Sequence, residues 1–352
     1  MARSRTQDRL ASMRGLLKRF TTPLLPDDYS AVLNPLWSTR ELRGRIEDVR
    51  RHGDVVLLEI TPGWGVQTNF KPGQYIGIGV EVDGRYVWRS YSLTNAPDSN
   101  QGRFSIAVKA VEKGKLSQHL IGTASPGTAI RIAAPAGDFY LPNPVPAKIA
   151  FITAGTGITP VISMLRGMQE RQEFGQSDVV LHHSVRSLND HVFAEVLEQF
   201  AKDIRIHIRQ TSIEGRLQAE DLEQLEPDLR QREIFACGPA EMLDYWQQWA
   251  GDDVAFHSER FSLQRSSDAE GGTIEFSNGG KATAASGTTI LEAGEAAGIP
   301  MPFGCRMGIC HTCVRQLEQG EVIDLLSGET HESGQRVRTC VSVPKGDIRV
   351  QT

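Results

Sequence analysis

Hydrophobic and polar residues follow two successive patterns along most of the chain. Between Leu42 and Ile132, short stretches such as "DVVLLEI", "QYIGIGV" and "RFSIAVKAV" alternate with turns of Gly, Pro, Asn and Asp. This spacing is typical of an antiparallel β-barrel. From about Ala147, apolar strands run into glycine-rich turns and helical patterns, as in "EIFACGPAEML". That alternation predicts an α/β domain with a parallel sheet.

The domain boundaries are expected where these patterns change. A chain of 352 residues is too long for one ordinary core. We predict a basic extension over residues 1–39, the barrel over 40–146 and the α/β domain over 147–261. Residues 262–272 are polar without apolar periodicity, which indicates a linker. A third domain then covers 273–352.

Composition narrows the class of protein. The chain is 39% hydrophobic and 23% charged with a net charge of -5, values typical of a soluble globular protein without a nucleic-acid partner. Its longest uncharged run, 149–165, is broken by two glycines and a proline, so we expect no membrane span. With no secretory signal, we predict a cytoplasmic protein with reduced cysteines. The third domain holds 11 acidic against 7 basic residues from Asp268 onward, which would favour a basic partner.

The N-terminal segment "MARSRTQDRLASMRGLLKRF" contains six basic residues against Asp8. Its apolar residues have near-helical spacing, which suits peripheral contact with an anionic inner membrane or an acidic partner. A solvated tail is the favoured interpretation, and an organellar transit peptide has a similar composition.

Four of the five cysteines have the spacing of iron-sulfur ligands. They are Cys305, Cys310, Cys313 and Cys340. The C-x4-C-x2-C run followed by a distant cysteine matches the plant-type [2Fe-2S] pattern. Gly304 and Gly308 would let the backbone wrap closely and direct N–H groups at the cluster. The alternative is a four-cysteine zinc site, but such sites usually present two C-x2-C pairs, so a cluster is favoured.

Two segments of the predicted barrel suit a flavin dinucleotide. "WRSYSLTN" supplies a guanidinium, a ring and a hydroxyl from Arg89, Tyr91 and Ser92. "KGKLSQHL" places residues 114–117 in a turn that opens a helix, where N–H groups and a hydroxyl can bind pyrophosphate. Each segment alone could also be an ordinary strand or turn.

Two strand ends in the α/β domain suit a second dinucleotide. In "FITAGTGITP" an apolar strand enters a glycine loop and then a helix with Pro160 near its start, so amides and the helix dipole face an anion. "FACGPAEM" ends another strand in Gly238 and Pro239, at the sheet edge where ligands bind. Cys237 is either a small buried residue or a thiol beside a reacting ring.

Taken in this order, the motifs resemble the ferredoxin-NADP reductase superfamily with a C-terminal plant-type ferredoxin domain, from about Arg40 to Thr352. The resemblance implies an FAD-binding barrel, an NAD(P)H-binding α/β domain and an α+β ferredoxin domain of the β-grasp type. The flavin residues it implies are Arg89, Tyr91, Ser92, Lys109, Gly114, Lys115, Leu116 and Ser117. The nicotinamide-dinucleotide residues it implies are Gly155, Thr156, Gly157, Pro160, Cys237, Gly238, Pro239 and Met242. Tyr91, Ser92 and Cys237 would lie at the reacting rings, and Phe261 would cover the flavin.

The choice of nucleotide depends on the segment after the second strand of the α/β domain. Ser184, Arg186 and Ser187 lie there, and a guanidinium at this place could pair with the 2′-phosphate of NADPH. Alternatively, Arg186 contacts only the surface or the diphosphate and the enzyme uses NADH. We favour NADPH.

These inferences predict an electron-transfer enzyme. NADPH gives up two electrons as hydride, whereas an iron-sulfur cluster accepts one at a time, so a flavin must stand between them. The segment "PLLPDDYSAVLNPLWSTRELRGRI" resembles reductases of bacterial membrane acyl-CoA or acyl-lipid desaturases, which indicates a fatty-acid desaturase as acceptor. The alternatives are an NADH-dependent reductase of a soluble aromatic-ring oxygenase, and a zinc-stabilised or redox-sensing interaction protein on a nucleotide-binding scaffold.

Overall fold

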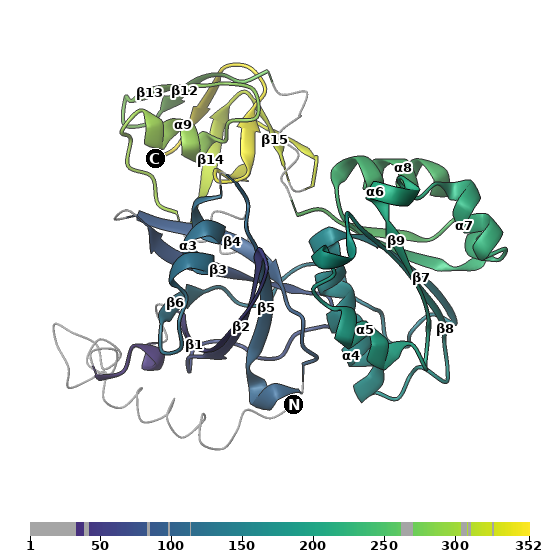
Figure 1. The fold of residues 1–352 in the computed structure, drawn as a ribbon. Coiled ribbons are helices and arrows are strands. Elements are labelled where there is room, and N and C mark those ends of the chain that lie inside the picture. Colours follow the sequence, from purple (N-terminus) through teal and green to yellow (C-terminus); the bar gives the residue numbers. More distant parts are fainter. Residues whose placement is uncertain are drawn as a thin grey trace.

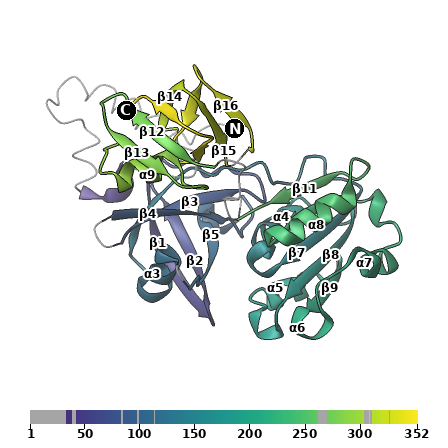
Figure 2. The ribbon, with the colours of Figure 1, turned by 90° about the horizontal axis from the view of Figure 1, so that it is seen from above.

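The computed structural model describes residues 33–38, 42–82, 85–97, 99–112, 114–261, 270–303, 308, 311–325 and 327–352, with only the backbone of 85, 86 and 100. Most of the predicted basic extension, most of the predicted linker, Cys305 and Cys310 lie outside these residues. Figures 1 and 2 show three lobes: a central β-domain, an α/β domain on one side of it, and a C-terminal domain over the β-domain.

The first lobe is a six-stranded antiparallel sheet with the order β4-β3-β6-β1-β2-β5. Its strands are β1 (Arg43–His52), β2 (Val55–Pro62), β3 (Tyr75–Val82), β4 (Arg85–Ser92), β5 (Phe104–Lys109) and β6 (Ala129–Ile132). Alternate residues such as Leu58 and Ile60 point into a closed core, as period-2 patterning requires. Helix α3 (Lys115–Thr123) packs on this core through Leu116 and Leu120. The predicted antiparallel barrel is confirmed.

The segment before the first strand closes on the barrel. A short 3-10 helix, η1 (Pro35–Trp37), places the Trp37 ring on Trp64, with ring centroids 4.9 Å apart. The amide of Trp64 donates to the carbonyl of Leu36 at 2.9 Å. No helix in the part of the chain that the structure describes is long and apolar enough to cross a bilayer.

The second lobe is a five-stranded parallel sheet with the order β11-β10-β7-β8-β9. Its strands are β7 (Lys148–Ala154), β8 (Asp178–Val185), β9 (Arg205–Gln210), β10 (Glu233–Cys237) and β11 (Phe256–Glu259). Its helices are α4 (Ile158–Glu170), α5 (Ala194–Phe200), α6 (Thr211–Glu214), α7 (Ala219–Leu225) and α8 (Ala240–Ala250). The inner strands are continuous apolar runs because one core lies against α4 and α5 and another against α7 and α8. The predicted parallel sheet is confirmed.

The third lobe combines sheets with one helix. Its strands are β12 (Gly272–Phe276), β13 (Lys281–Ala284), β14 (Val314–Gln319), β15 (Glu321–Asp324), β16 (Thr330–Glu332), β17 (Arg336–Arg338), β18 (Ser342–Pro344) and β19 (Ile348–Val350). The sheet orders are β13-β12-β19-β14-β17 and β16-β15-β18. Helix α9 (Ile290–Ala296) begins with a capping box of Thr289 and Glu292. The predicted α+β domain is confirmed.

Helix α4 fixes the α/β domain against the barrel. The fully buried Ser163 donates to the carbonyl of Asn95 at 2.7 Å and accepts from the amide of Gly73 at 3.4 Å. One turn further, Arg166 donates to the carbonyl of Thr94 at 2.6 Å. A Cβ on Gly167 would lie 2.5 Å from Pro72 Cγ, so the two surfaces touch at backbone distance. The loop that opens α4 is therefore held in place relative to β4.

Candidate functional site

The two glycine-rich strand ends of the α/β domain meet at one place. Strand order reverses at β7, with β8 on one side and β10 on the other, so the carboxyl ends of β7 and β10 lie at the switch point of the sheet, which is called the crevice below. The loop after β7, Gly155–Gly157, leads into α4, and Cys237 ends β10 directly beside it. A Cβ on Gly157 would lie 2.0 Å from the carbonyl oxygen of Cys237, which only glycine avoids. Parallel sheets bind dinucleotides in such a crevice.

The neighbouring predicted residues shape the same edge. Pro160 lies in the first turn of α4, where its missing N–H costs no helical hydrogen bond. The Thr156 carbonyl accepts the Thr159 hydroxyl at 2.9 Å, which closes the loop before the helix. Across the crevice, Gly238 leaves room for Met242, whose Cε would lie 2.6 Å from a Cβ there. Pro239 precedes α8.

Strand β4 carries Arg89 and Tyr91 on one face and Ser92 on the other. Arg89 is exposed and donates to the carbonyl of Trp88 at 2.7 Å, whereas Tyr91 packs on the barrel core. Burial raises the pKa of the Tyr91 hydroxyl, so its ring stays neutral. Ser92, the last residue of β4, is 6% exposed and faces the α/β domain.

The start of α3 has the predicted turn, and its predicted serine also makes hydrogen bonds within the chain. The hydroxyl of Ser117 accepts from the amide of Val111 at 3.2 Å and donates to the carbonyl of Gly114 at 3.1 Å, so it shapes the turn. Leu116 is buried in the barrel core. The groups at this turn that suit a pyrophosphate are therefore the first-turn amides and the exposed Lys115. Lys109, at the end of β5, pairs with Asp54 at 3.5 Å.

The carboxyl group of Glu259, at the end of β11, connects two strands that carry predicted site residues. These strands are β4, called the flavin strand below, and β10, called the nicotinamide strand, which lies beside β11. The Ser92 hydroxyl donates to Glu259 Oε2 at 3.4 Å, and Glu259 lies opposite Cys237 in the β10–β11 register. Burial raises the pKa of Glu259 to about 8. Burial, reinforced by Glu259, raises the pKa of the Cys237 thiol, so this cysteine is protonated at neutral pH. Sequence reasoning missed Glu259, although an acidic residue ending the last strand of a parallel sheet was an available signal.

Three residues after the second strand of the α/β domain were predicted to select the nucleotide, and among them only Arg186 is charged and exposed. Ser184 is buried within β8, and Ser187 donates through both its amide and its hydroxyl to Asp190 Oδ2, at 3.1 and 3.0 Å. Arg186 is exposed between them. Phe261 lies two residues beyond Glu259 and its side chain is 49% exposed.

The third lobe brings together the two described cysteines of the motif. Cys313 and Cys340 are buried, and their Sγ atoms lie 3.1 Å apart. The amide of Gly308 donates to Cys340 Sγ at 3.3 Å. Paired soft donors with an amide directed at one sulfur fit an iron-sulfur cluster.

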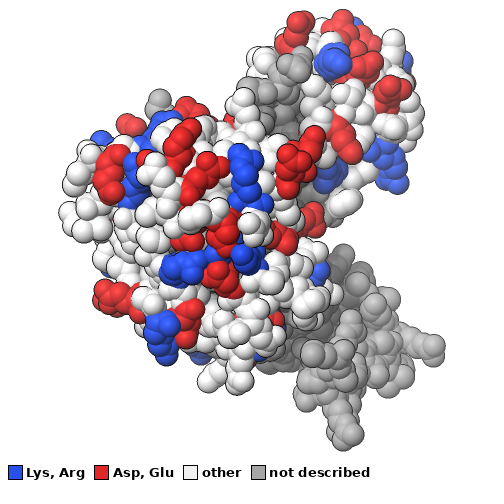
Figure 3. Space-filling model, turned by 90° about the vertical axis from the view of Figure 1, so that its right-hand side faces the viewer, with Lys and Arg blue, Asp and Glu red and all other residues white. Residues whose placement is uncertain are grey.

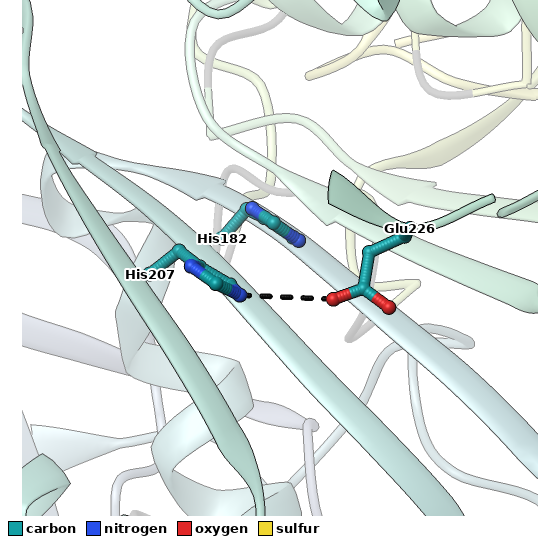
Figure 4. Close-up of side chains that lie close together, drawn as sticks. All are labelled: His182, His207 and Glu226. Carbon is teal, nitrogen blue, oxygen red and sulfur yellow. Dashed lines mark ion pairs between the residues drawn. The ribbon is translucent and has the colours of Figure 1, made fainter. Parts of the chain in front are cut away.

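A further cluster, His182, His207 and Glu226, has the composition of a metal site (Figure 4). The histidine rings are stacked at 4.7 Å with planes only 8° apart, so their in-plane lone pairs run parallel and do not converge on one ion. Glu226 already pairs with Arg205 at 2.9 Å and lies 3.7 Å from Arg232. Burial lowers the pKa of His182 to about 3 and keeps it neutral. We interpret this group as a structural ion-pair network.

Family comparisons agree with this order of domains. The model described as "Oxidoreductase FAD-binding domain" matches residues 61–140, "Oxidoreductase NAD-binding domain" matches 151–248, and "2Fe-2S iron-sulfur cluster binding domain" matches 276–345. The last match supports the cluster over the zinc alternative and over a redox-sensing interaction protein.

Individual relatives extend the agreement over nearly the whole chain. A protein of Mycobacterium tuberculosis named NADPH oxidoreductase is 48% identical over 348 residues, 96% of this chain and 91% of the relative. The glycine betaine monooxygenase reductase subunit of Pseudomonas aeruginosa is 32% identical, covering 79% of this chain and 86% of the relative. Phthalate dioxygenase reductase superposes with a TM-score of 0.65 at 23% identity, over 89% of this chain and 98% of that one, which shows the shared fold.

Glu259→Gln is expected to remove a pH dependence of stability. Folding raises the pKa of this carboxyl from its ordinary 4.5 to about 8, so the folded protein keeps a proton that the unfolded chain releases. The stability that Glu259 contributes is therefore complete below pH 4.5 and is lost as the pH rises through 8. Between pH 5.5 and 8.5 the Tm of the wild type should fall by about 2–4 °C relative to the variant.

Thermal unfolding monitored by circular dichroism measures this difference. Glu241→Gln, at an exposed carboxylate that pairs with Arg216, is the matched control and should keep a constant offset from the wild type. Parallel Tm curves for the wild type and Glu259→Gln would contradict a raised pKa at Glu259.

Proposed function

Because the chain belongs to the ferredoxin-NADP reductase superfamily and carries a C-terminal [2Fe-2S] ferredoxin domain, we propose that its crevice and cluster loop form one electron path from NADPH to an oxygen-activating iron enzyme. When bound, FAD supplies the exchange between two-electron and one-electron transfer. The observation that carries the proposal is the Ser92–Glu259 contact, because it brings the flavin strand and the nicotinamide strand to one point.

The side chains at that point have distinct proposed roles. Tyr91 offers a neutral ring for stacking, and Arg89 with the first turn of α3 binds the phosphates. Ser92 and Cys237 face the reacting rings, with an uncharged hydroxyl and thiol that add no charge to the crevice. Glu259, protonated below about pH 8, holds Ser92 in place and offers a proton at its carboxyl.

Two observations support NADPH as the nucleotide. Arg186 follows β8 with an exposed guanidinium, which suits a 2′-phosphate, and Ser187 is committed to Asp190. The relative that is 48% identical is named an NADPH oxidoreductase. Gly155, Thr156 and Gly157 would then hold the diphosphate, and Gly238 and Pro239 the nicotinamide side.

The proposed ligands of the cluster are the four cysteines of the motif. The Sγ atoms of Cys313 and Cys340 lie 3.1 Å apart in the described part of the domain. By their spacing in the sequence, Cys305 and Cys310 would complete the set of four ligands. Such a cluster exchanges one electron at a time, and thiolate ligation with a hydrogen bond to a sulfur would help to set its reduction potential.

The proposed acceptor is a membrane fatty-acid desaturase. The support is the resemblance of the segment that leads into β1 to reductases of such desaturases. A membrane-bound acceptor would place the protein at the cytoplasmic face of the inner membrane, with the basic N-terminus toward the lipid. A relative named glycine betaine monooxygenase reductase subunit favours a second candidate, an oxygenase that is not a membrane desaturase. On the face shown in Figure 3, acidic and basic side chains are interspersed, so charge alone does not select between them.

The two acceptors are separable by reconstitution. With NADPH in excess, a purified desaturase in phospholipid vesicles is expected to turn over at least tenfold faster than a soluble oxygenase at the same concentration. NADPH oxidation coupled to product formation gives both rates. The reverse order would contradict the desaturase assignment and support the second candidate.

Arg186→Ala should reduce kcat/KM for NADPH by about ten- to a hundredfold, because a charge-assisted hydrogen bond to the 2′-phosphate is worth about 1.5–3 kcal/mol. Turnover with NADH should change less than twofold. Ferricyanide reduction measures both. Arg230→Ala, an exposed arginine before β10 at the opposite sheet edge, is the control; equal losses with both nucleotides would refute a 2′-phosphate contact.

Cys340→Ser is expected to abolish the iron-sulfur absorbance and cytochrome c reduction, because a hydroxyl replaces one thiolate ligand. NADPH-dependent ferricyanide reduction should stay within twofold of the wild type, since the crevice lies in other domains. Visible spectra and the two acceptor assays separate these effects. Loss of both activities in a folded, flavin-loaded variant would contradict a flavin step independent of the cluster.

A further inference from the structure

An arginine two residues before Cys340 links the cluster loop to a buried carboxylate. Arg338 Nη1 donates to the carbonyl of Gly308 at 3.0 Å. Its Nε and Nη2 atoms donate to Asp324 Oδ2 at 3.1 and 2.7 Å. One guanidinium therefore contacts both the loop that carries the cysteine motif and the end of β15.

The carboxylate that holds Arg338 is itself fixed. Asp324 is 1% exposed, and its Oδ1 accepts from the amide of Ser327 at 3.2 Å. Its carbonyl accepts from the amide of Gly328 at 2.8 Å, which closes the turn after β15. A buried, hydrogen-bonded carboxylate with a charged partner gives a rigid anchor.

The residue at the other end of this chain of contacts touches a proposed cluster ligand. Gly308 has a φ of 72°, in the left-handed region that glycine adopts readily. Its amide donates to Cys340 Sγ while its carbonyl accepts from Arg338. The Gly308 N–H and C=O belong to adjacent peptide units, so Arg338, by holding the carbonyl, restrains the φ and ψ torsions that set the direction of the N–H toward the sulfur.

We propose that Asp324 and Arg338 are positioning residues that keep the Gly308 amide on Cys340 Sγ and thereby raise the reduction potential of the cluster. The inference rests on the proposed ligation of the cluster by Cys340. Reduction adds one electron, and an N–H directed at a ligand sulfur stabilises the added negative charge. Releasing Arg338 should weaken that hydrogen bond and lower the potential.

The test uses the full-length protein loaded with FAD and cluster. Arg338→Lys keeps the charge, but a single ammonium cannot contact both the Gly308 carbonyl and Asp324 in the same way. Asp324→Asn removes a negative charge near the cluster, which by charge alone would raise the potential, whereas release of Arg338 lowers it. Arg336→Lys, at an exposed arginine of the same strand, is the matched control.

Redox titration followed by electron paramagnetic resonance gives the potential of the cluster. Both variants are expected to lower it by the equivalent of a tenfold shift in the reduction equilibrium, 59 mV for a one-electron couple, with altered g-values of the reduced cluster. Arg336→Lys should change neither quantity. If Asp324→Asn fails to fold, Arg338→Lys decides alone.

An unchanged potential in cluster-loaded Arg338→Lys, or a raised potential in Asp324→Asn, would overturn the positioning role. Wild-type protein that binds no cluster after reconstitution with iron and sulfide would instead refute the proposed ligation. The two failures are therefore distinct.

Discussion

The crevice depends on the contact between Gly157 and the carbonyl of Cys237. The loop after β7 and the end of β10 approach each other at backbone distance, so no side chain fits between them at Gly157. Strand order reverses at β7, and the helices that follow β7 and β10 lie on different sides of the sheet. Helix α4 packs on one core of the sheet and α8 on the other. A dinucleotide site at this edge follows from the topology, and the glycine lets the two loops approach.

The barrel adds its part through polar contacts that the apolar cores do not supply. Ser163 and Arg166 of α4 bind carbonyls of the segment after β4, and Ser92 reaches Glu259. These contacts fix the flavin strand relative to the nicotinamide strand. In the third lobe the Asp324–Arg338 pair has a similar place, because Arg338 also holds the Gly308 carbonyl, beside a proposed cluster ligand. Polar groups thus set the positions on which electron transfer depends.

The local signals were enough to predict the three kinds of domain and the two glycine-rich strand ends that meet at Gly157 and Cys237. Apolar runs ending in glycine marked the parallel strands, and cysteine spacing marked the cluster. The sequence could not show which side chains meet from different elements. The sequence did not show, for example, that the Ser117 hydroxyl also bonds to the turn before its own helix. Glu259 and Asp324 appeared as ordinary acidic residues, because their importance comes from neighbours 167 and 14 positions away.

Anaerobic reduction of the purified protein by NADPH, followed by visible absorption, tests the central claim most directly. The account predicts flavin and iron-sulfur bands that both bleach, and more rapidly with NADPH than with NADH. Flavin bleaching with an intact iron-sulfur spectrum would contradict a continuous path. Absence of both chromophores after reconstitution with FAD, iron and sulfide would contradict the function itself.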